Sequence, residues 1–155
     1  MKNKASQSYL LYIFVALGLI WLKSSWGKLS GGDFVGSLGS TLTRFASQNP
    51  YPWYKDFLTS FAIPNSQVFG QLVLWGELLV ALGLILIPLY LIFQKKSSRT
   101  AYLLLAVSFF GAVLLSGSFW LAAGWTSPST ESVNLLMLLI EAIGLIYSYR
   151  KYQTS

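Results

Sequence analysis

Residues Val68–Phe93 read VFGQLVLWGELLVALGLILIPLYLIF, an apolar run whose only charged residue is Glu77. The hydrocarbon core of a bilayer is about 30 Å thick, and about 20 helical residues cross it. The run is therefore long enough to span a membrane as a helix. Further apolar stretches lie at Tyr9–Leu22, Ala101–Trp125 and Val133–Tyr149. We predict an all-α integral membrane protein in which four spanning helices form a bundle.

Composition supports this class and bounds the domain organisation. Of the 155 residues, 54% are hydrophobic and 10% are charged, whereas soluble domains are about 25% charged. A chain of this length has room for one bundle, so we predict a single domain over residues 1–155. The net charge of +6 sits at predicted helix ends and forms no long basic run. This pattern predicts contact with membrane lipid and no nucleic-acid partner.

The chain contains no cysteine and no histidine. Disulfides, thiol redox chemistry and cysteine-bound iron–sulfur clusters are thereby excluded, and haem and structural zinc lose their usual ligands. We therefore predict no metal site and no cofactor held covalently or through a metal. If the protein takes part in redox chemistry, its electrons need a membrane quinone, a flavin or a partner subunit.

Lysine and arginine gather in three zones, and cytoplasmic flanks of membrane helices are rich in these residues. The zones are the N-terminus, the link Gln94–Thr100 and the C-terminal end. They alternate as required if both termini are cytoplasmic, in a bacterial or archaeal cytoplasmic membrane or a thylakoid-type membrane. The link Lys23–Ser66 then lies outside despite its basic residues, since long loops follow the charge rule weakly. The basic residues of the three zones are Lys2, Lys4, Lys95, Lys96, Arg99, Arg150 and Lys151.

A cleaved signal peptide is the alternative interpretation of the N-terminus. Met1–Lys4 is basic, Tyr9–Leu22 is a short apolar core, and Ser25–Gly27 is a small-x-small triplet of the kind found at cleavage sites. Cleavage would leave three spans. Trp21 and Trp26 indicate instead an interfacial aromatic belt on a retained helix.

The ends of the predicted helices follow from capping residues and length. The first helix should continue to about Lys28, because its apolar core is too short to span alone. Asn65 or Ser66 is the expected N-cap of the second span. Pro88 should kink the cytoplasmic end of that span, and the fourth span is expected to start at Ser132.

The long outer link carries two short helical patterns. The first is amphipathic and is expected to lie on the membrane surface. The prolines of Asn49–Tyr54 should interrupt it, and a second short helix is expected after them. Its aromatic residues fit either an interface anchor or a lid over the mouth of the bundle. The apolar positions of the two helices are Phe34, Leu38, Leu42 and Phe45, and Trp53, Phe57 and Phe61.

The predicted spans hold two acidic residues, Glu77 and Glu141. Glu77 lies roughly 18 Å along its helix from Asn65, and Glu141 lies roughly 13 Å from Ser132, at 1.5 Å per residue. Both carboxylates are thus expected near the middle of the membrane, where an isolated charge costs at least ~2.5 kcal/mol.

Three interpretations of these carboxylates remain open. Lys23 and Lys28 approach from the outer end of the first helix, so the simplest arrangement pairs one lysine with one glutamate, and we expect Lys28 to approach Glu77. Such a pair is either a structural element of the bundle or part of a polar site for a ligand headgroup or a proton relay. The third interpretation is a glutamate kept protonated by burial.

Several sequence blocks resemble the DoxX/DoxD family of small four-helix membrane proteins, over the whole chain. The specific ones are NPYPWY and GELLV. The resemblance is greatest to the DoxD branch, the membrane subunits of thiosulfate:quinone oxidoreductases. One departure is that family members often carry an arginine within the first helix, whereas this chain has none there. The matching blocks are Gly27–Leu29, Asn49–Leu58, Ile63–Asn65, Gly76–Val80, Ser127–Thr130 and Asn134–Met137.

The resemblance implies oxidation of thiosulfate to tetrathionate, with electrons passed to a membrane quinone and with a second subunit as partner. A small dianion needs cations at the outer mouth, and a quinone headgroup needs hydrogen-bond partners within the bilayer. Glu77 and Lys28 are the candidate catalytic residues. The candidate binding residues are Lys23, Trp53, Trp75 and Glu141, and Arg44 and Lys55 are further cations at the mouth.

Two other functions remain compatible with the sequence. One is a non-catalytic accessory subunit of a larger respiratory or photosynthetic membrane complex, which the aromatic-rich outer link favours. The other is a small proton-coupled transporter that uses Glu77 and Glu141, although transporters usually carry internal repeats and this chain has no clear repeat.

Overall fold

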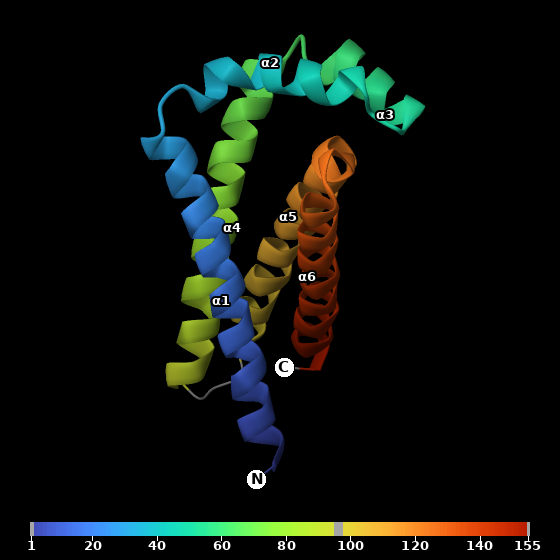
Figure 1. The fold of residues 1–155 in the computed structure, drawn as a ribbon. Coiled ribbons are helices and arrows are strands. Elements are labelled where there is room, and N and C mark those ends of the chain that lie inside the picture. Colours follow the sequence, from blue (N-terminus) through green and yellow to red (C-terminus); the bar gives the residue numbers. More distant parts are fainter. Residues whose placement is uncertain (1, 95–97, 155) are drawn as a thin grey trace.

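The computed structural model describes residues 2–94 and 98–154 (Figure 1). Within these residues every regular element is a helix, which confirms the all-α prediction. Lys95 and Lys96, on which the predicted orientation draws, lie outside the described residues.

Long helices form the body of the protein, and in the part of the chain that the structure describes 4 helices are long and apolar enough to cross a membrane. They are α1 (Lys2–Ser30), α4 (Ser66–Gln94), α5 (Arg99–Ala123) and α6 (Pro128–Thr154). In α1 the apolar span is Tyr9–Ser30. The prediction of an integral membrane bundle with four spanning helices is therefore confirmed at the level of helix length and composition.

The long helices pack as two pairs, α1 with α4 and α5 with α6, and α4 joins the pairs by packing on α5 (Figure 1). Small residues allow these close approaches. A Cβ added to Gly18 of α1 would lie 2.7 Å from Ile85 Cγ1 of α4. Likewise, a Cβ on Gly144 of α6 would overlap the ring of Phe109 on α5. The lack of a side chain at these two glycines leaves room for Ile85 and Phe109 and allows the helices of each pair to lie close together.

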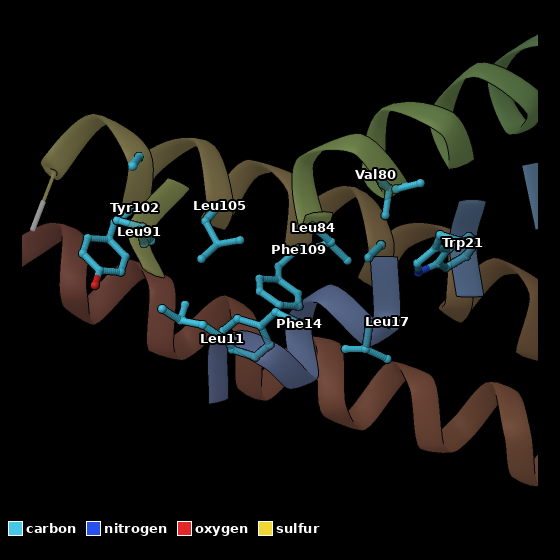
Figure 2. Packing of buried hydrophobic residues seen from close by; sticks show 13 residues of the cluster. Leu11, Phe14, Leu17, Trp21, Val80, Leu84, Leu91, Tyr102, Leu105 and Phe109 are labelled. Atoms are coloured by element: carbon cyan, nitrogen blue, oxygen red, sulfur yellow. The ribbon is translucent and has the colours of Figure 1, made fainter. Parts of the chain in front are cut away.

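A continuous apolar core runs along the inside of the bundle, from Tyr102 near one end to Trp21 near the other (Figure 2). At its centre Phe14 and Phe109 meet edge to face, with ring centroids 4.6 Å apart. Lipid is as apolar as these side chains, so their burial contributes through close packing rather than through removal from water.

The helix α2 (Phe34–Ser47) lies across one end of the bundle and forms part of a roof (Figure 1). Asp33 caps α2, because its Oδ1 accepts a hydrogen bond of 2.9 Å from the backbone N–H of Gly36. Gly32 makes the turn from α1 with a φ of 105°, a conformation that glycine adopts readily. The predicted amphipathic helix is confirmed, and it turns Leu38 and Ala46 inward.

The rest of the roof is α3 (Pro52–Phe57) and one π-helical turn, η1 (Leu58–Ala62). The second short helix was predicted, and it begins at Pro52, because proline fits the first turn of a helix. Two side chains fasten this part of the roof to α5. The Asn49 amide donates to the Leu121 carbonyl at 3.0 Å, and the Tyr54 hydroxyl donates to the Ser118 carbonyl at 3.2 Å.

One predicted helix start is confirmed and another needs correction. The helix α4 starts at Ser66, within the predicted pair Asn65 and Ser66. The Asn65 side chain does not cap α4, because its amide donates to the carbonyl of Phe61 in the preceding turn at 2.8 Å. The last helix starts at Pro128 rather than Ser132. Ser127 caps it, with its Oγ accepting from the Thr130 N–H at 3.1 Å. A proline at the first helical position favoured the earlier start.

Candidate functional site

An ion pair between Lys28 and Glu77 lies where the end of α1 meets the middle of α4. Lys28 Nζ is 2.8 Å from both carboxylate oxygens of Glu77 and 2.9 Å from Ser24 Oγ. The Glu77 side chain is 0% exposed, and the Lys28 side chain is 21% exposed. The predicted approach of these two residues is confirmed. The pair removes the cost of an isolated buried carboxylate.

The local sequence explains why each partner is available. Lys28 lies in the last turn of α1, where a positive charge also interacts favourably with the helix dipole. Glu77 lies on the buried face of α4, one turn from Leu74 and from Ala81. The carboxylate is therefore forced inward with its helix face, and Lys28 is the cation that reaches it.

Two aromatic rings complete the surroundings of the Lys28 ammonium. Its Nζ lies 5.3 Å from the ring centroid of Phe34 at the start of α2 and 5.9 Å from that of Phe119 on α5. Both distances are in the range of cation–π attraction. The ammonium is thus held at the meeting point of α1, α2, α4 and α5.

Lys28 also lines a cavity of about 640 Å³ beneath the roof. Its wall is mainly aliphatic and aromatic, and the size and lining are those of a small-molecule pocket. A few polar side chains interrupt the apolar wall. They are Lys28, Thr41 and Tyr54, with Ser118 and Asn134 from the helix pair α5 and α6.

The cavity wall includes exposed side chains of α4 and α5. Leu72 of α4 is 62% exposed and Leu114 of α5 is 54% exposed, and both line the cavity. Both helices are long and apolar enough to cross a membrane, so this side of the cavity is compatible with lipid contact. Lys28 rather than Glu77 is the charged residue that lines the cavity.

Glu141 belongs to a separate polar cluster on α6. Its side chain is fully buried, and its Oε1 accepts a hydrogen bond of 2.8 Å from the indole N–H of Trp21. Its Oε2 and the hydroxyl of Ser116 are also buried, and the two side chains interact with each other without reaching good hydrogen-bond geometry. Trp21 therefore supplies the polar contact that links α1 to α6.

The predicted interfacial role of Trp21 is wrong. Its side chain is 2% exposed, because the ring fills the core while the N–H satisfies Glu141. Trp26, the other residue of the predicted belt, is exposed, as an interfacial tryptophan would be.

The remaining candidate binding residues do not converge on the cavity. Lys23 is exposed on α1. Trp53 is exposed on the roof and packs against the Tyr54 ring, with centroids 5.4 Å apart. Trp75 is exposed on α4 and donates to Gln71 Oε1 at 2.9 Å. None of these three lines the cavity wall, so the structure brings together Lys28 and Glu77 alone among the predicted site residues.

Sequence reasoning missed Tyr54 and Asn49 as site residues, although both lie in the quoted NPYPWY block. Burial raises the pKa of the Tyr54 phenol above its usual 10.0, and the interaction with Ser118 lowers it by less. The phenol is therefore protonated at neutral pH and serves as a hydrogen-bond donor. The sequence did contain an indication of these contacts. A tyrosine and an asparagine lie beside prolines in Asn49–Tyr54, and both bind the bundle.

Among the described residues there is no group of three or more carboxylate, histidine or cysteine side chains that could hold a metal ion. Comparison of the chain with protein families, with curated proteins and with solved structures finds no match. The resemblance to the DoxX/DoxD family therefore stays a prediction, and the functional argument rests on the site itself.

Proposed function

We propose that this protein is the quinone-binding membrane subunit of a quinone-linked oxidoreductase of the thiosulfate-oxidising type, working with a second subunit. The observation that carries the proposal is the Lys28–Glu77 ion pair, whose lysine lines an apolar cavity that has exposed side chains of α4 and α5 in its wall. A quinone has a polar ring and a long apolar tail. The cavity offers a charged hydrogen-bond donor for the ring and an apolar exit for the tail.

Lys28 is the residue that would contact the quinone. Its ammonium has three N–H donors. The hydrogen bond that it can most readily give up in favour of a ligand is the one to Ser24 Oγ. A quinone carbonyl oxygen in that place would accept a charge-assisted hydrogen bond. As the ring is reduced, negative charge grows on that oxygen and Lys28 stabilises it, while Glu77 keeps the lysine in place.

The overall reaction balances without a metal on this chain. Two thiosulfate ions lose one electron each and form the central S–S bond of tetrathionate. The quinone takes up the two electrons and two protons and becomes a quinol. Because the chain has no cysteine or histidine, the thiosulfate chemistry is assigned to the partner subunit.

Arg44 supports an anion-binding role for the outer end. It lines an open groove of about 580 Å³ with Thr126 and Thr130. Phe45 borders both this groove and the cavity. A polar, water-facing site for a small dianion would therefore lie one side chain away from the cavity.

The orientation with both termini cytoplasmic is part of the proposal. The native chain has no cysteine, so single engineered cysteines report position without background. Ser129→Cys at the roof end of α6 should react with an impermeant maleimide in intact cells. Thr154→Cys at the other end of the same helix should react only after permeabilisation. The reverse pattern would invert the orientation and place the roof in the cytoplasm.

The decisive experiment measures thiosulfate-dependent quinone reduction by the protein purified in mild detergent with its natural partners. Glu77→Gln should lower turnover at least tenfold, because the lysine loses its counter-charge. Glu131→Gln is the matched control, since Glu131 is exposed at the start of α6. Yield and elution volume of each variant separate a site defect from a folding defect. Absence of quinone reduction in the intact assembly would refute the oxidoreductase proposal.

A second candidate function is a non-catalytic accessory subunit of a larger membrane complex. The observation that favours it is the exposed aromatic surface of the roof, where Trp53 and Phe61 both lie open. Such a surface is typical of protein contact sites. Co-purification with a respiratory or photosynthetic complex, with Glu77→Gln changing only assembly, would support this function over the first.

A further inference from the structure

A second site lies on α6, at the opposite end of the molecule from the roof. An open groove of about 380 Å³ is lined by Ile143, Ile146, Tyr147, Arg150, Lys151 and Thr154. These residues recur every three to four positions, so they form one face of the helix. We call this surface the α6 groove.

The groove changes character along its length. Ile143 and Ile146, on the side toward the middle of the helix, are exposed, although they lie in the predicted span Pro128–Thr154. Arg150 and Lys151 follow at the helix end. The step from Ile143 to Thr154 covers about 16 Å at 1.5 Å per residue. This is an apolar strip that leads into a cationic end, which matches one acyl chain and the phosphate of a phospholipid.

The charge distribution favours an anionic ligand at this end. The aspartate and glutamate side chains that are not buried in the bundle are Asp33, Asp56 and Glu131, which lie before α2, in α3 and in the first turn of α6. All three belong to the roof end. Arg99 adds a further cation beside the groove, with its guanidinium carbon 4.7 Å from the ring centroid of Tyr152.

The side chains beside the groove are also held in place. The Lys151 ammonium lies 5.9 Å from the ring centroid of Tyr147, which is itself a groove residue. Arg150 is exposed and has no ion-pair partner among the described residues. A guanidinium in this position can bind two phosphate oxygens at once.

We propose that the α6 groove binds one anionic phospholipid, with the phosphate on Arg150 and Lys151 and an acyl chain along Ile143 and Ile146. Basic surfaces beside membrane helices bind anionic headgroups in this way. The site is independent of the cavity under the roof, so it does not rest on the proposed quinone function.

Native mass spectrometry of the purified full chain tests the proposal, with phosphatidylglycerol and phosphatidylcholine added in equal amounts. The wild type should retain phosphatidylglycerol in preference. The double variant Arg150→Gln/Lys151→Gln should lose about 30-fold in affinity for it, because each basic residue contributes about a fivefold step. The control Lys23→Gln/Lys55→Gln removes the same charge from the roof end and should bind as the wild type does.

Two further measurements decide what the groove recognises. Arg150→Lys should restore only part of the binding lost in Arg150→Gln, because it keeps the charge but not the guanidinium that can bind two phosphate oxygens. Circular dichroism of each variant confirms that the helices are intact. Glycerol phosphate, which has the headgroup but no acyl chain, should bind far more weakly than phosphatidylglycerol. Equal binding of glycerol phosphate would make the ligand a free phosphate and overturn the proposal. Unchanged phosphatidylglycerol affinity in the folded double variant would overturn it as well.

Discussion

The two buried glutamates of the bundle have opposite surroundings. Glu77 has a full positive charge at 2.8 Å on both oxygens, whereas Glu141 has an indole N–H on one oxygen and no well-oriented hydrogen bond on the other. Glu77 pairs with a lysine that lines a cavity, whereas Glu141 lies in the packed core. The residue type is the same, so its environment decides whether it belongs to a binding site or to the packing.

Both glutamates contact the same face of α1. Trp21 and Lys28 lie about two turns apart on that helix, and each reaches the carboxylate of a different helix. The helix α1 therefore carries the partner groups for both α4 and α6. The comparison predicts that variants at Lys28 leave the Glu77 carboxylate buried without its cation. Variants at Trp21 or Glu141 should instead remove the hydrogen bond from the indole N–H to the carboxyl group.

The largest effect is expected from Lys28→Met. It leaves the Glu77 carboxylate buried without its cation, which typically destabilises a protein by about 3–5 kcal/mol. Replacing both partners, as Lys28→Met/Glu77→Leu, should restore much of that loss because no lone charge remains. Equilibrium unfolding in mixed detergent micelles measures both values. A loss below about 1 kcal/mol for Lys28→Met would mean that the pair is not a main element of stability.

An intermediate effect is expected from Glu141→Leu. It removes the acceptor of the Trp21 N–H, and an unsatisfied buried donor costs about 1–3 kcal/mol. Glu141→Gln keeps an oxygen for that N–H and should unfold close to the wild type in the same assay. Equal, large losses for Gln and Leu would show that charge at Glu141 matters, and the contrast between the two glutamates would then disappear.

The smallest effect is expected from Tyr54→Phe, which removes the hydrogen bond from the roof to Ser118. A single neutral hydrogen bond contributes about 0.5–1.5 kcal/mol. The pKa of Tyr54 is raised on folding, so its contribution is fully present below the unfolded pKa of about 10. That contribution is lost as the pH rises through the higher folded value. The wild type and Tyr54→Phe should therefore differ equally at pH 7 and pH 9 and converge at higher pH.

The sequence was sufficient to predict the helices and the Lys28–Glu77 pair, because each of these depends on only one or two physical factors. Length and hydropathy identify a spanning helix, and the cost of a buried charge requires a partner within reach. The start of α6 was placed too late because Pro128 was assigned to a linker, although proline fits the first turn of a helix. The choice between Lys23 and Lys28 depended on which face of α1 turns inward.

The cavity and the role of Trp21 were not predictable in the same way. A cavity depends on how far apart two helix pairs lie, which no single residue encodes. Tryptophan suits both a membrane interface and a core that offers a hydrogen-bond acceptor, so its position in the sequence left the choice open. Asn49 and Tyr54 could be recognised as part of a motif, but their acceptors are backbone carbonyls of α5. Every residue has a backbone carbonyl, so the sequence does not show which one would accept these hydrogen bonds.

The close approach of α1 and α4 at Gly18 has a mechanical consequence. Gly18 touches α4 directly, and Lys28 lies about 15 Å further along α1 at 1.5 Å per residue. The contact acts as a fulcrum and the outer half of α1 as a lever arm. A larger residue at this fulcrum would tilt α1, and a tilt of about 10° would displace the Lys28 backbone by about 3 Å over that arm. A substitution at Gly18 would thus change the distance between Lys28 and Glu77, although Gly18 contacts neither of them.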